Sequence, residues 1–108
     1  MTEPTHNLNI VQNLANEDFV KLCHAQESYG NSWKRRGGVG AFMMLARKWD
    51  RIENQVGKMK YDVFATIADD PSSTGIIDDI RDLRRYLLLV EAEMIGNGIV
   101  EQDNASGL

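Results

Sequence analysis

The sequence predicts an all-α protein, a small bundle of three to five helices. Two long segments carry apolar residues at the 3.6-residue spacing of an amphipathic helix, and glycines or prolines separate the helical segments. No segment shows the alternation of apolar and polar residues that marks a half-buried strand. The 108 residues fit one small domain, with an ordinary globular balance of 43% hydrophobic and 26% charged residues.

The N-terminal part of the chain holds the first predicted helix. Residues 1–16 form either an arm or a short helix, because the spacing of their apolar side chains suits both conformations. Asn16 is a good N-cap, and the acids Glu17 and Asp18 then lie near the positive end of the helix dipole. We therefore expect a helix over 17–28, which begins the domain proper.

The clearest helix lies in the middle of the chain. One stripe of that helix holds Phe42, Leu45, Ala46, Trp49, Ile52 and Val56. Gly57 is a natural stop. A short helix is then expected over 61–68, with Phe64 and Ile67 facing inward. Asp70-Pro71 ends it, because the residue before a proline avoids helical angles.

A long last helix is expected over 75–95, where candidate caps are Ser72, Ser73 and Thr74. Its apolar stripe consists of Ile76, Ile80, Leu83, Leu87, Val90 and Met94. Leu88 and Leu89 widen the apolar surface beyond the needs of one core, so we expect a homo-oligomer, a dimer or larger, formed through this helix. The helical domain thus spans 17–95, and residues 96–108 are expected to be a flexible polar tail.

Two pairs of acids lie at the edges of these apolar stripes. With each residue turning by about 100°, Glu53 lies about 40° and Asp50 about 100° from Trp49. On the last helix, one shoulder of the stripe carries four polar side chains, which are Asp79, Asp82, Tyr86 and Glu93. If the two helices pack through their stripes, the carboxylates of Asp50, Glu53, Asp79 and Asp82 converge.

Such a cluster has two interpretations. Four oxygen donors suit a hard cation such as Mg²⁺, which is often held by a few carboxylates together with water and substrate phosphates. Alternatively, the acids form surface salt bridges with neighbouring arginines, for which the candidates are Arg47, Arg51, Arg81 and Arg84.

The connector between the first two long helices carries unusual chemistry for a link. Lys34, Arg35 and Arg36 supply positive charge, and Gly37 and Gly38 let the backbone approach a ligand at a helix N-terminus. The other candidate ligand-binding residues are Tyr29 and Trp33, which can stack on a base, and Asn31 and Ser32, which can form hydrogen bonds. The connector is therefore either a nucleotide-binding loop or a polar turn whose aromatic residues fill the core.

Composition excludes some classes of function. The net charge of −4 and pI of about 5.1 argue against general nucleic-acid binding, which uses a basic surface. No run approaches the roughly 20 apolar residues of a membrane span, and no secretory leader is visible, so we expect a cytoplasmic protein without a membrane partner. Cys23, the single cysteine, lies among apolar residues and is expected to be a buried thiol.

Three strings, "YGNSW", "RKWDRIE" and "DDIRDLRRYLLL", give the chain a resemblance to a family. Over roughly residues 17–95 it resembles the phage nucleotide-modification-associated domain, which is similar in layout to the MazG-like all-α nucleotide pyrophosphohydrolases. Those enzymes bind Mg²⁺ through two acidic pairs and cleave nucleoside triphosphates to the monophosphate and pyrophosphate. The resemblance assigns Asp50-x-x-Glu53 to the first pair and Asp79-x-x-Asp82 to the second, with aspartates at two positions where the family has glutamates.

Three hypotheses of function follow. In the first, Glu53, Asp79 and Asp82 hold Mg²⁺, Asp50 orients the attacking water and the loop cations hold the phosphates of a (d)NTP. In the second, the same pocket sequesters a linear or cyclic nucleotide signal of bacterial antiviral defence without turnover. In the third, the chain is a helical accessory module that assembles with another protein. If the chain is phage-encoded, its place is the cytoplasm of the infected bacterium.

Overall fold

The structure is a computed structural model that describes residues 6–69 and 75–101 of the chain. All of its regular elements are helical, which confirms the all-α fold class for the described residues. The chain divides between Arg35 and Arg36 into two compact units, and each unit is described by itself. Among the described residues, no helix combines the length and the apolar character that crossing a membrane requires.

The first unit is built on α1 (His6–Tyr29), followed by a short 3₁₀ helix, η1 (Ser32–Lys34). The expected helix start at Asn16 is wrong, because no glycine or proline interrupts residues 6–29 and the helix continues through the candidate cap. α1 ends at Tyr29, and the next residue, Gly30, has a φ of 59° that suits glycine and donates its N–H to the Gln26 carbonyl at 3.0 Å.

Two side chains of α1 differ from expectation. Cys23 is exposed, so the prediction of a buried thiol is wrong. The apolar residues on the same helix face, Phe19 and Val20, are 70% and 50% exposed as well. Asp18, expected in the first turn of a helix, lies in the middle of α1 and is only 1% exposed. Asp18, which the sequence suggested as an acid at the start of a helix, is therefore a buried polar group in the structure.

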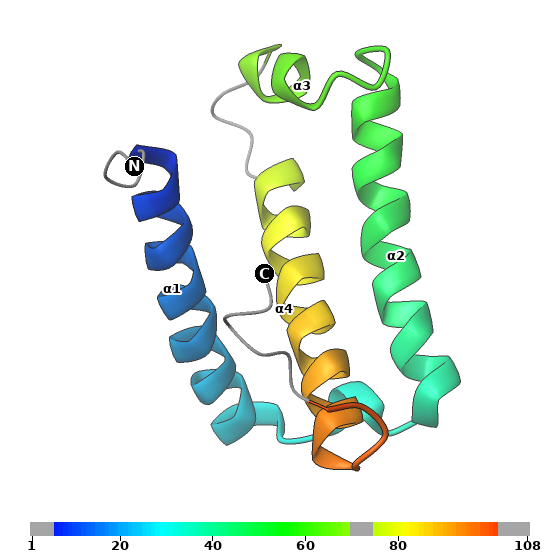
Figure 1. The fold of residues 1–108 in the computed structure, drawn as a ribbon. Coiled ribbons are helices and arrows are strands. Elements are labelled where there is room, and N and C mark those ends of the chain that lie inside the picture. The colour runs from blue at the N-terminus through cyan, green and yellow to red at the C-terminus, as the bar shows by residue number, and fades with distance from the viewer. Residues whose placement is uncertain (1–5, 70–74, 102–108) are drawn as a thin grey trace. The chain divides into compact units, whose positions relative to one another are not determined.

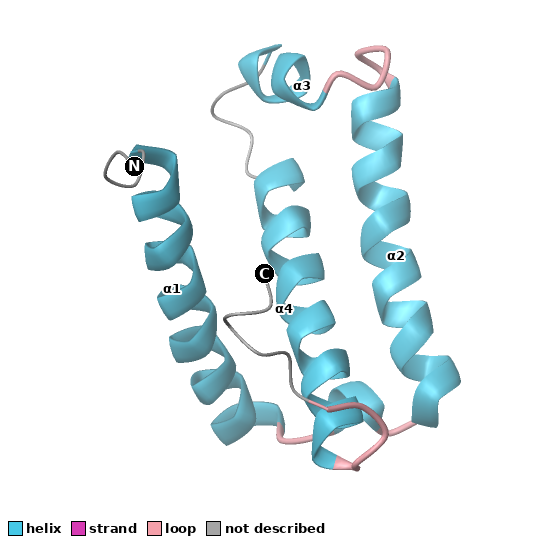
Figure 2. Ribbon diagram, in the orientation of Figure 1, coloured by secondary structure: helices cyan, strands magenta, loops and turns pink. Residues whose placement is uncertain are grey.

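The second unit is organised around two long helices, α2 (Gly37–Gly57) and α4 (Gly75–Gly96). They lie side by side and run in opposite directions (Figures 1 and 2). The predicted helix over 75–95 and the predicted stop at Gly57 are both confirmed. The described residues bury only three hydrophobic side chains, Ala41, Ile52 and Ile76, all of which belong to this helix pair.

The face of α2 that meets α4 is rotated from the predicted stripe. Ile52 is buried as expected, but Phe42 and Trp49 are 64% and 55% exposed. These two residues lie about 80° and 60° around the helix from Ile52, on one flank, whereas Lys48 lies about 40° away on the other flank. The packed face therefore takes in polar side chains, and part of the apolar stripe stays outside.

The short helix α3 (Val63–Asp69) follows a tight turn after α2 and contacts α2 (Figure 2). Asp62 caps α3, because its Oδ1 accepts hydrogen bonds from the Phe64 and Ala65 N–H groups at 3.0 and 2.9 Å. The prediction that Phe64 faces inward is wrong, since its side chain is 81% exposed, whereas Ile67 is half-buried. In a helix this short, few side chains can face its single packing partner.

The ends of α3 and α4 complete the description. The predicted stop at Asp70-Pro71 and the predicted caps Ser72, Ser73 and Thr74 lie outside the described residues. After Gly96 the backbone folds back on α4, because the Ile99 N–H donates to the Met94 carbonyl at 3.0 Å and Gly98 takes a φ of 74°. The expected tail therefore begins with a capping turn over 97–101.

Candidate functional site

Asp79 is the polar centre of the α2–α4 pair. It is 2% exposed, yet both carboxylate oxygens have partners on α2. Arg51 Nε donates to Oδ1 at 2.9 Å, and Gln55 Nε2 donates to Oδ2 at 3.1 Å. A buried carboxylate is costly unless it is paired and hydrogen-bonded, and these two contacts meet that condition. Asp79 therefore joins the two helices.

Lys48 connects the second acid of this pair to the same network. Its Nζ lies 3.0 Å from Asp82 Oδ2 and 3.8 Å from Asp79 Oδ1. The Lys48 side chain is 18% exposed and that of Asp82 is 43% exposed, so the network reaches the surface at Asp82. Of the two predicted interpretations, the salt bridge is the one that describes Asp79 and Asp82. Arg51 was among the predicted cationic partners, whereas Lys48 was not.

The predicted convergence of four carboxylates is wrong within this unit. Asp50 and Glu53 are exposed, and they lie about 160° and 100° around α2 from Ile52. Lys48, Arg51 and Gln55 occupy the opposite flank, between about 40° and 100° from Ile52. The physical reason is the rotation of α2 about its axis. The rotation that brings Lys48 and Arg51 to Asp79 turns Asp50 and Glu53 away from α4.

A metal centre built from these acids does not fit the arrangement. Among the residues that the structure describes, no three His, Cys, Asp or Glu side chains lie close enough to hold an ion together. The inner carboxylate, Asp79, already uses both oxygens for Arg51 and Gln55. Binding Mg²⁺ there would leave a guanidinium and an amide without their partner, so we derive no catalytic step through a metal.

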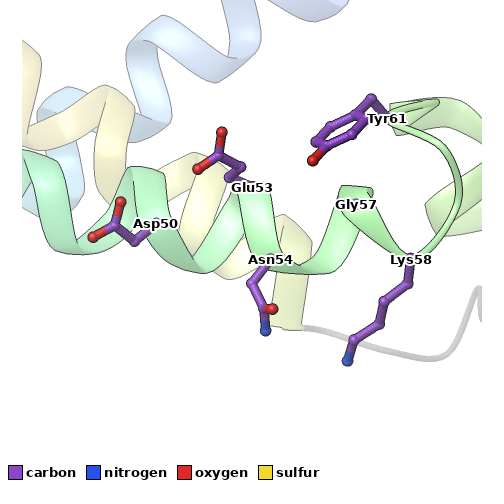
Figure 3. A pocket seen from close by; sticks show the side chains of 6 residues that line it. All are labelled: Asp50, Glu53, Asn54, Gly57, Lys58 and Tyr61. Carbon is purple, nitrogen blue, oxygen red and sulfur yellow. The ribbon is translucent and has the colours of Figure 1, made fainter.

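Asp50 and Glu53 instead line an open pocket of about 520 Å³ at the C-terminal end of α2. Figure 3 shows its six lining residues, which are Asp50, Glu53, Asn54, Gly57, Lys58 and Tyr61. The side chains of Glu53 and Tyr61 project from the same side of the helix end, and the tyrosine hydroxyl is directed back toward the helix. The lining residues thus include two carboxylates, an amide, an ammonium group and an aromatic ring, and the Asn54 and Lys58 side chains point away from Tyr61 in this view.

The turn after α2 sets the position of the tyrosine. The Tyr61 N–H donates to the Val56 carbonyl at 2.8 Å, and both Lys60 and Tyr61 adopt positive φ, at 56° and 64°. That conformation is uncommon for residues other than glycine and costs free energy. The Tyr61 ring lies beside Gly57, where a Cβ would meet three atoms of the tyrosine side chain at 3.7 Å, an ordinary van der Waals contact.

The predicted ligand-binding loop is shared between the two units. Tyr29 ends α1 and is 74% exposed, and Asn31 precedes η1. η1 consists of Ser32, Trp33 and Lys34, of which Trp33 and Lys34 are half-buried. Arg35 is exposed and closes the first unit, and Arg36 begins the second, followed by Gly37 and Gly38 in the first turn of α2. The predicted cavity that this loop shares with the acids stays a prediction.

Tyr86, the remaining predicted ligand-binding residue, is half-buried in α4. It lies about 20° around the helix from Asp79, so it belongs to the face that packs against α2. Tyr86 lies seven residues, or two helical turns, after Asp79, so both side chains are on the same side of α4, as their spacing in the sequence predicted.

Sequence reasoning missed several residues of the two sites. Lys48 and Gln55 hold the inner acids, and Asn54, Lys58 and Tyr61 line the pocket. The spacing of Lys48, Arg51 and Gln55 puts three donors on one face of a helix, opposite two acids spaced by three residues on α4. This complementary spacing could have predicted the ion pairs between α2 and α4. Nothing in the sequence around Tyr61 indicated that it lines a pocket.

Comparison with known protein families, curated proteins and solved structures gave no match to this chain.

Proposed function

We propose that the protein binds a nucleotide in the pocket at the C-terminal end of α2 and holds it without hydrolysing it. The proposal rests on one observation, the different surroundings of the two acid pairs. Asp79 and Asp82 are paired with cations of α2, whereas Asp50 and Glu53 line an open pocket beside Tyr61 and Lys58. Only Asp50 and Glu53 therefore face a pocket that a ligand can enter.

The chemistry of the pocket matches the parts of a nucleotide. The Tyr61 ring is 70% exposed and offers a stacking surface for a base. The carboxylates of Asp50 and Glu53 accept hydrogen bonds from sugar hydroxyls or from exocyclic amino groups, and Asn54 can both donate and accept. Lys58 supplies a positive charge for phosphate. A volume of about 520 Å³ lies within the usual range of small-molecule sites, about 300–1,000 Å³.

Sequestration is favoured over hydrolysis by the state of the inner acids. A pyrophosphohydrolase of the type that the sequence resembles needs both acid pairs as metal ligands. In this protein Asp79 accepts hydrogen bonds from Arg51 and Gln55, and a metal ion on Asp79 would have to displace both donors. Asp50 and Glu53, the acid pair in the pocket, supply only two of the four carboxylates that such an enzyme uses.

The proposal is tested with a panel of linear and cyclic nucleotides, each with and without Mg²⁺. A ligand at 100 times its Kd stabilises the folded chain by about 2.7 kcal/mol, which a thermal-shift assay detects readily. Mass spectrometry of the supernatant after heat denaturation should recover the bound nucleotide intact. Pyrophosphate released in the presence of Mg²⁺, and lost in Glu53→Gln, would replace sequestration by hydrolysis. Absence of a shift with every nucleotide would refute the proposal.

Variants of the pocket locate the ligand. Tyr61→Ala should weaken nucleotide binding by about 1–3 kcal/mol, or roughly 5- to 150-fold in Kd, because it removes the stacking surface. Tyr61→Phe keeps the ring and should bind within a few-fold of the natural chain. Isothermal titration calorimetry measures both. Equal loss in the two variants would show that the hydroxyl, and not stacking, holds the ligand.

Charge variants complete the test. Lys58→Ala should weaken binding of phosphorylated ligands, and Lys21→Ala, which removes an equal charge from α1 outside the pocket, should not. Arg35→Ala and Arg36→Ala test the predicted role of the loop, which leads into the opposite, N-terminal end of α2. Weaker phosphate binding by either folded variant would add the loop to the site. If both arginine variants bound the nucleotide as tightly as the natural chain, the predicted role of the loop would be wrong and the pocket at α2 would be the whole site.

A further inference from the structure

The face of α2 that points away from α4 is apolar, and the described residues of the second unit do not cover it. Its large side chains are Val39, Phe42, Met43 and Trp49, which are 78%, 64%, 57% and 55% exposed. Ala46 lies at the centre of this group. With each residue turning by about 100°, the four large side chains all fall within about 60° of Ala46 around the helix axis. α2 therefore carries a second stripe beside the one that packs on α4, and we call it the outer stripe.

The outer stripe has the spacing of a helix–helix seam. Its members recur at intervals of three and four residues, from Val39 through Phe42 or Met43, Ala46 and Trp49 to Glu53, which is the pattern of paired helices. A small residue at the centre lets a second helix approach closely. Isolated exposed apolar residues are common, but a continuous row of this kind marks an interaction site.

The charges at the two ends of the outer stripe are opposite. Arg36 and the positive end of the helix dipole lie at the N-terminal end, and Asp50 and Glu53 lie toward the C-terminal end. About 15 Å separates Arg36 from Ala46 along the axis, and Glu53 lies about 11 Å from Ala46 in the other direction. An antiparallel copy of the same helix would thus set basic ends against acidic ends.

We propose that the outer stripe pairs with the same stripe of a second copy of this chain, antiparallel, about a two-fold axis at Ala46. In this arrangement Val39 faces the partner's Glu53, Phe42 faces the partner's Asp50 and Arg36 lies one turn beyond, within reach of that acid pair. The stripe is self-complementary in charge, as an isologous interface requires.

The area of the outer stripe is compatible with a stable dimer. From the 150–250 Å² that an aromatic side chain can bury, the exposed parts of the four large side chains amount to roughly 500 Å². A standard interface buries about 800 Å² on each partner, so the apolar row supplies more than half, and the charged ends and the helix backbone contribute the rest. This is the composition of an interface with an apolar centre and a polar rim.

The dimer has a consequence for the pocket, and this consequence rests on the proposed function. Asp50 and Glu53 belong both to the outer stripe and to the pocket lining. The partner's Arg36 and the first amide groups of its α2 would lie at the rim of the pocket and add positive charge for a phosphate group. Each nucleotide site would then contain residues of both copies.

A disulfide at the two-fold axis tests the arrangement. The experiment uses the full chain with Cys23→Ser and one new cysteine, Ala46→Cys, since only a residue on the axis meets its own copy at the 4.4–6.8 Å Cα separation that a disulfide needs. Mild oxidation should give a covalent dimer in most of the protein. The matched control, Arg47→Cys in the same background, lies about 100° around the helix and should stay largely monomeric. The proposed two-fold axis at Ala46 would be wrong if both variants cross-linked equally, or if Ala46→Cys did not cross-link at all.

The charge pattern is tested separately by sedimentation equilibrium without nucleotide. Glu53→Arg should raise the dimer dissociation constant at least about ten-fold, since it sets like charges against each other, and Arg36→Glu in the same chain should restore most of the affinity. Circular dichroism checks that each variant is folded.

The last helix offers the competing surface, because Leu87 and Leu88 are 49% and 42% exposed. Leu88→Glu should therefore leave the dimer intact. A dimer that Leu88→Glu dissociates and Glu53→Arg does not would assign the interface to α4. A chain that is monomeric at all concentrations would mean that α1 or another protein covers the outer stripe. Nucleotide binding is measured independently through Tyr61→Ala, so failure of the dimer and failure of the ligand site are distinguishable.

Discussion

The two faces of α2 do not divide simply into an apolar buried face and a polar exposed face. The inner face meets α4 and contains Lys48, Arg51 and Gln55 beside Ile52, whereas the outer face is exposed and carries Phe42 and Trp49. The polar groups of the inner face are satisfied by Asp79 and Asp82. Burial in this helix pair is therefore decided by complementary partners as well as by hydrophobicity, and the apolar residues left outside are available for another molecule.

The same difference separates the two acid pairs. Each pair has the same spacing of three residues on a long helix, and the sequence treats them alike. One pair joins α2 to α4 and the other lines an open pocket. Two acid pairs with the same spacing thus have different surroundings according to the helix face on which each lies, and substitutions in the two pairs should have effects of very different size.

The largest effect is expected in the apolar part of the inner face. Ile52→Ala should lower the free energy of unfolding by about 2–4 kcal/mol, because it leaves a cavity between α2 and α4. Met43→Ala on the outer face removes a side chain that is 57% exposed and should cost less than about 0.5 kcal/mol at concentrations where the protein is monomeric. Urea unfolding followed by far-UV circular dichroism compares them. Similar losses would mean that the outer face is packed within the subunit.

The next effect concerns the buried acid. Asp79→Ala should cost about 1–3 kcal/mol, because the Gln55 amide and the Arg51 guanidinium lose their partner, although Arg51 is 53% exposed and recovers water contacts. The matched variant Asp50→Ala should change stability by no more than about 0.5 kcal/mol. Thermal unfolding reports the difference as a shift of about 4–8 °C for each kcal/mol. If Asp50→Ala proved the more damaging, the assignment of the two acid pairs would be reversed.

The smallest effect belongs to the ion pair at the edge of the inner face. A double-mutant cycle with Lys48→Ala and Asp82→Ala should give a coupling free energy of about 0.2–1 kcal/mol, because Asp82 is 43% exposed and solvent weakens the attraction. The coupling should decline further in 1 M salt, where the screening length is about 3 Å. A coupling that salt leaves unchanged would indicate a more deeply buried pair.

The local features of the fold were predictable from the sequence. Glycine at position 57 and the apolar periodicity of residues 76–94 gave the end of α2 and the extent of α4 within a residue or two. The start of α1 was not predictable from its capping residue, because a cap signals a helix start only where the preceding chain leaves the helix. Asn16 is preceded by residues that continue it.

The sequence by itself determined that this chain is helical, where its long helices lie and that acids border their apolar stripes. Only the tertiary structure decided which arc of α2 meets α4. The apolar residues of α2 cover more than half of the helix circumference, so periodicity alone allows more than one packed face. The buried carboxylate of Asp79 resolves the choice, because it requires Arg51 and Gln55 at its side, and this rotation turns Trp49 and Glu53 outward.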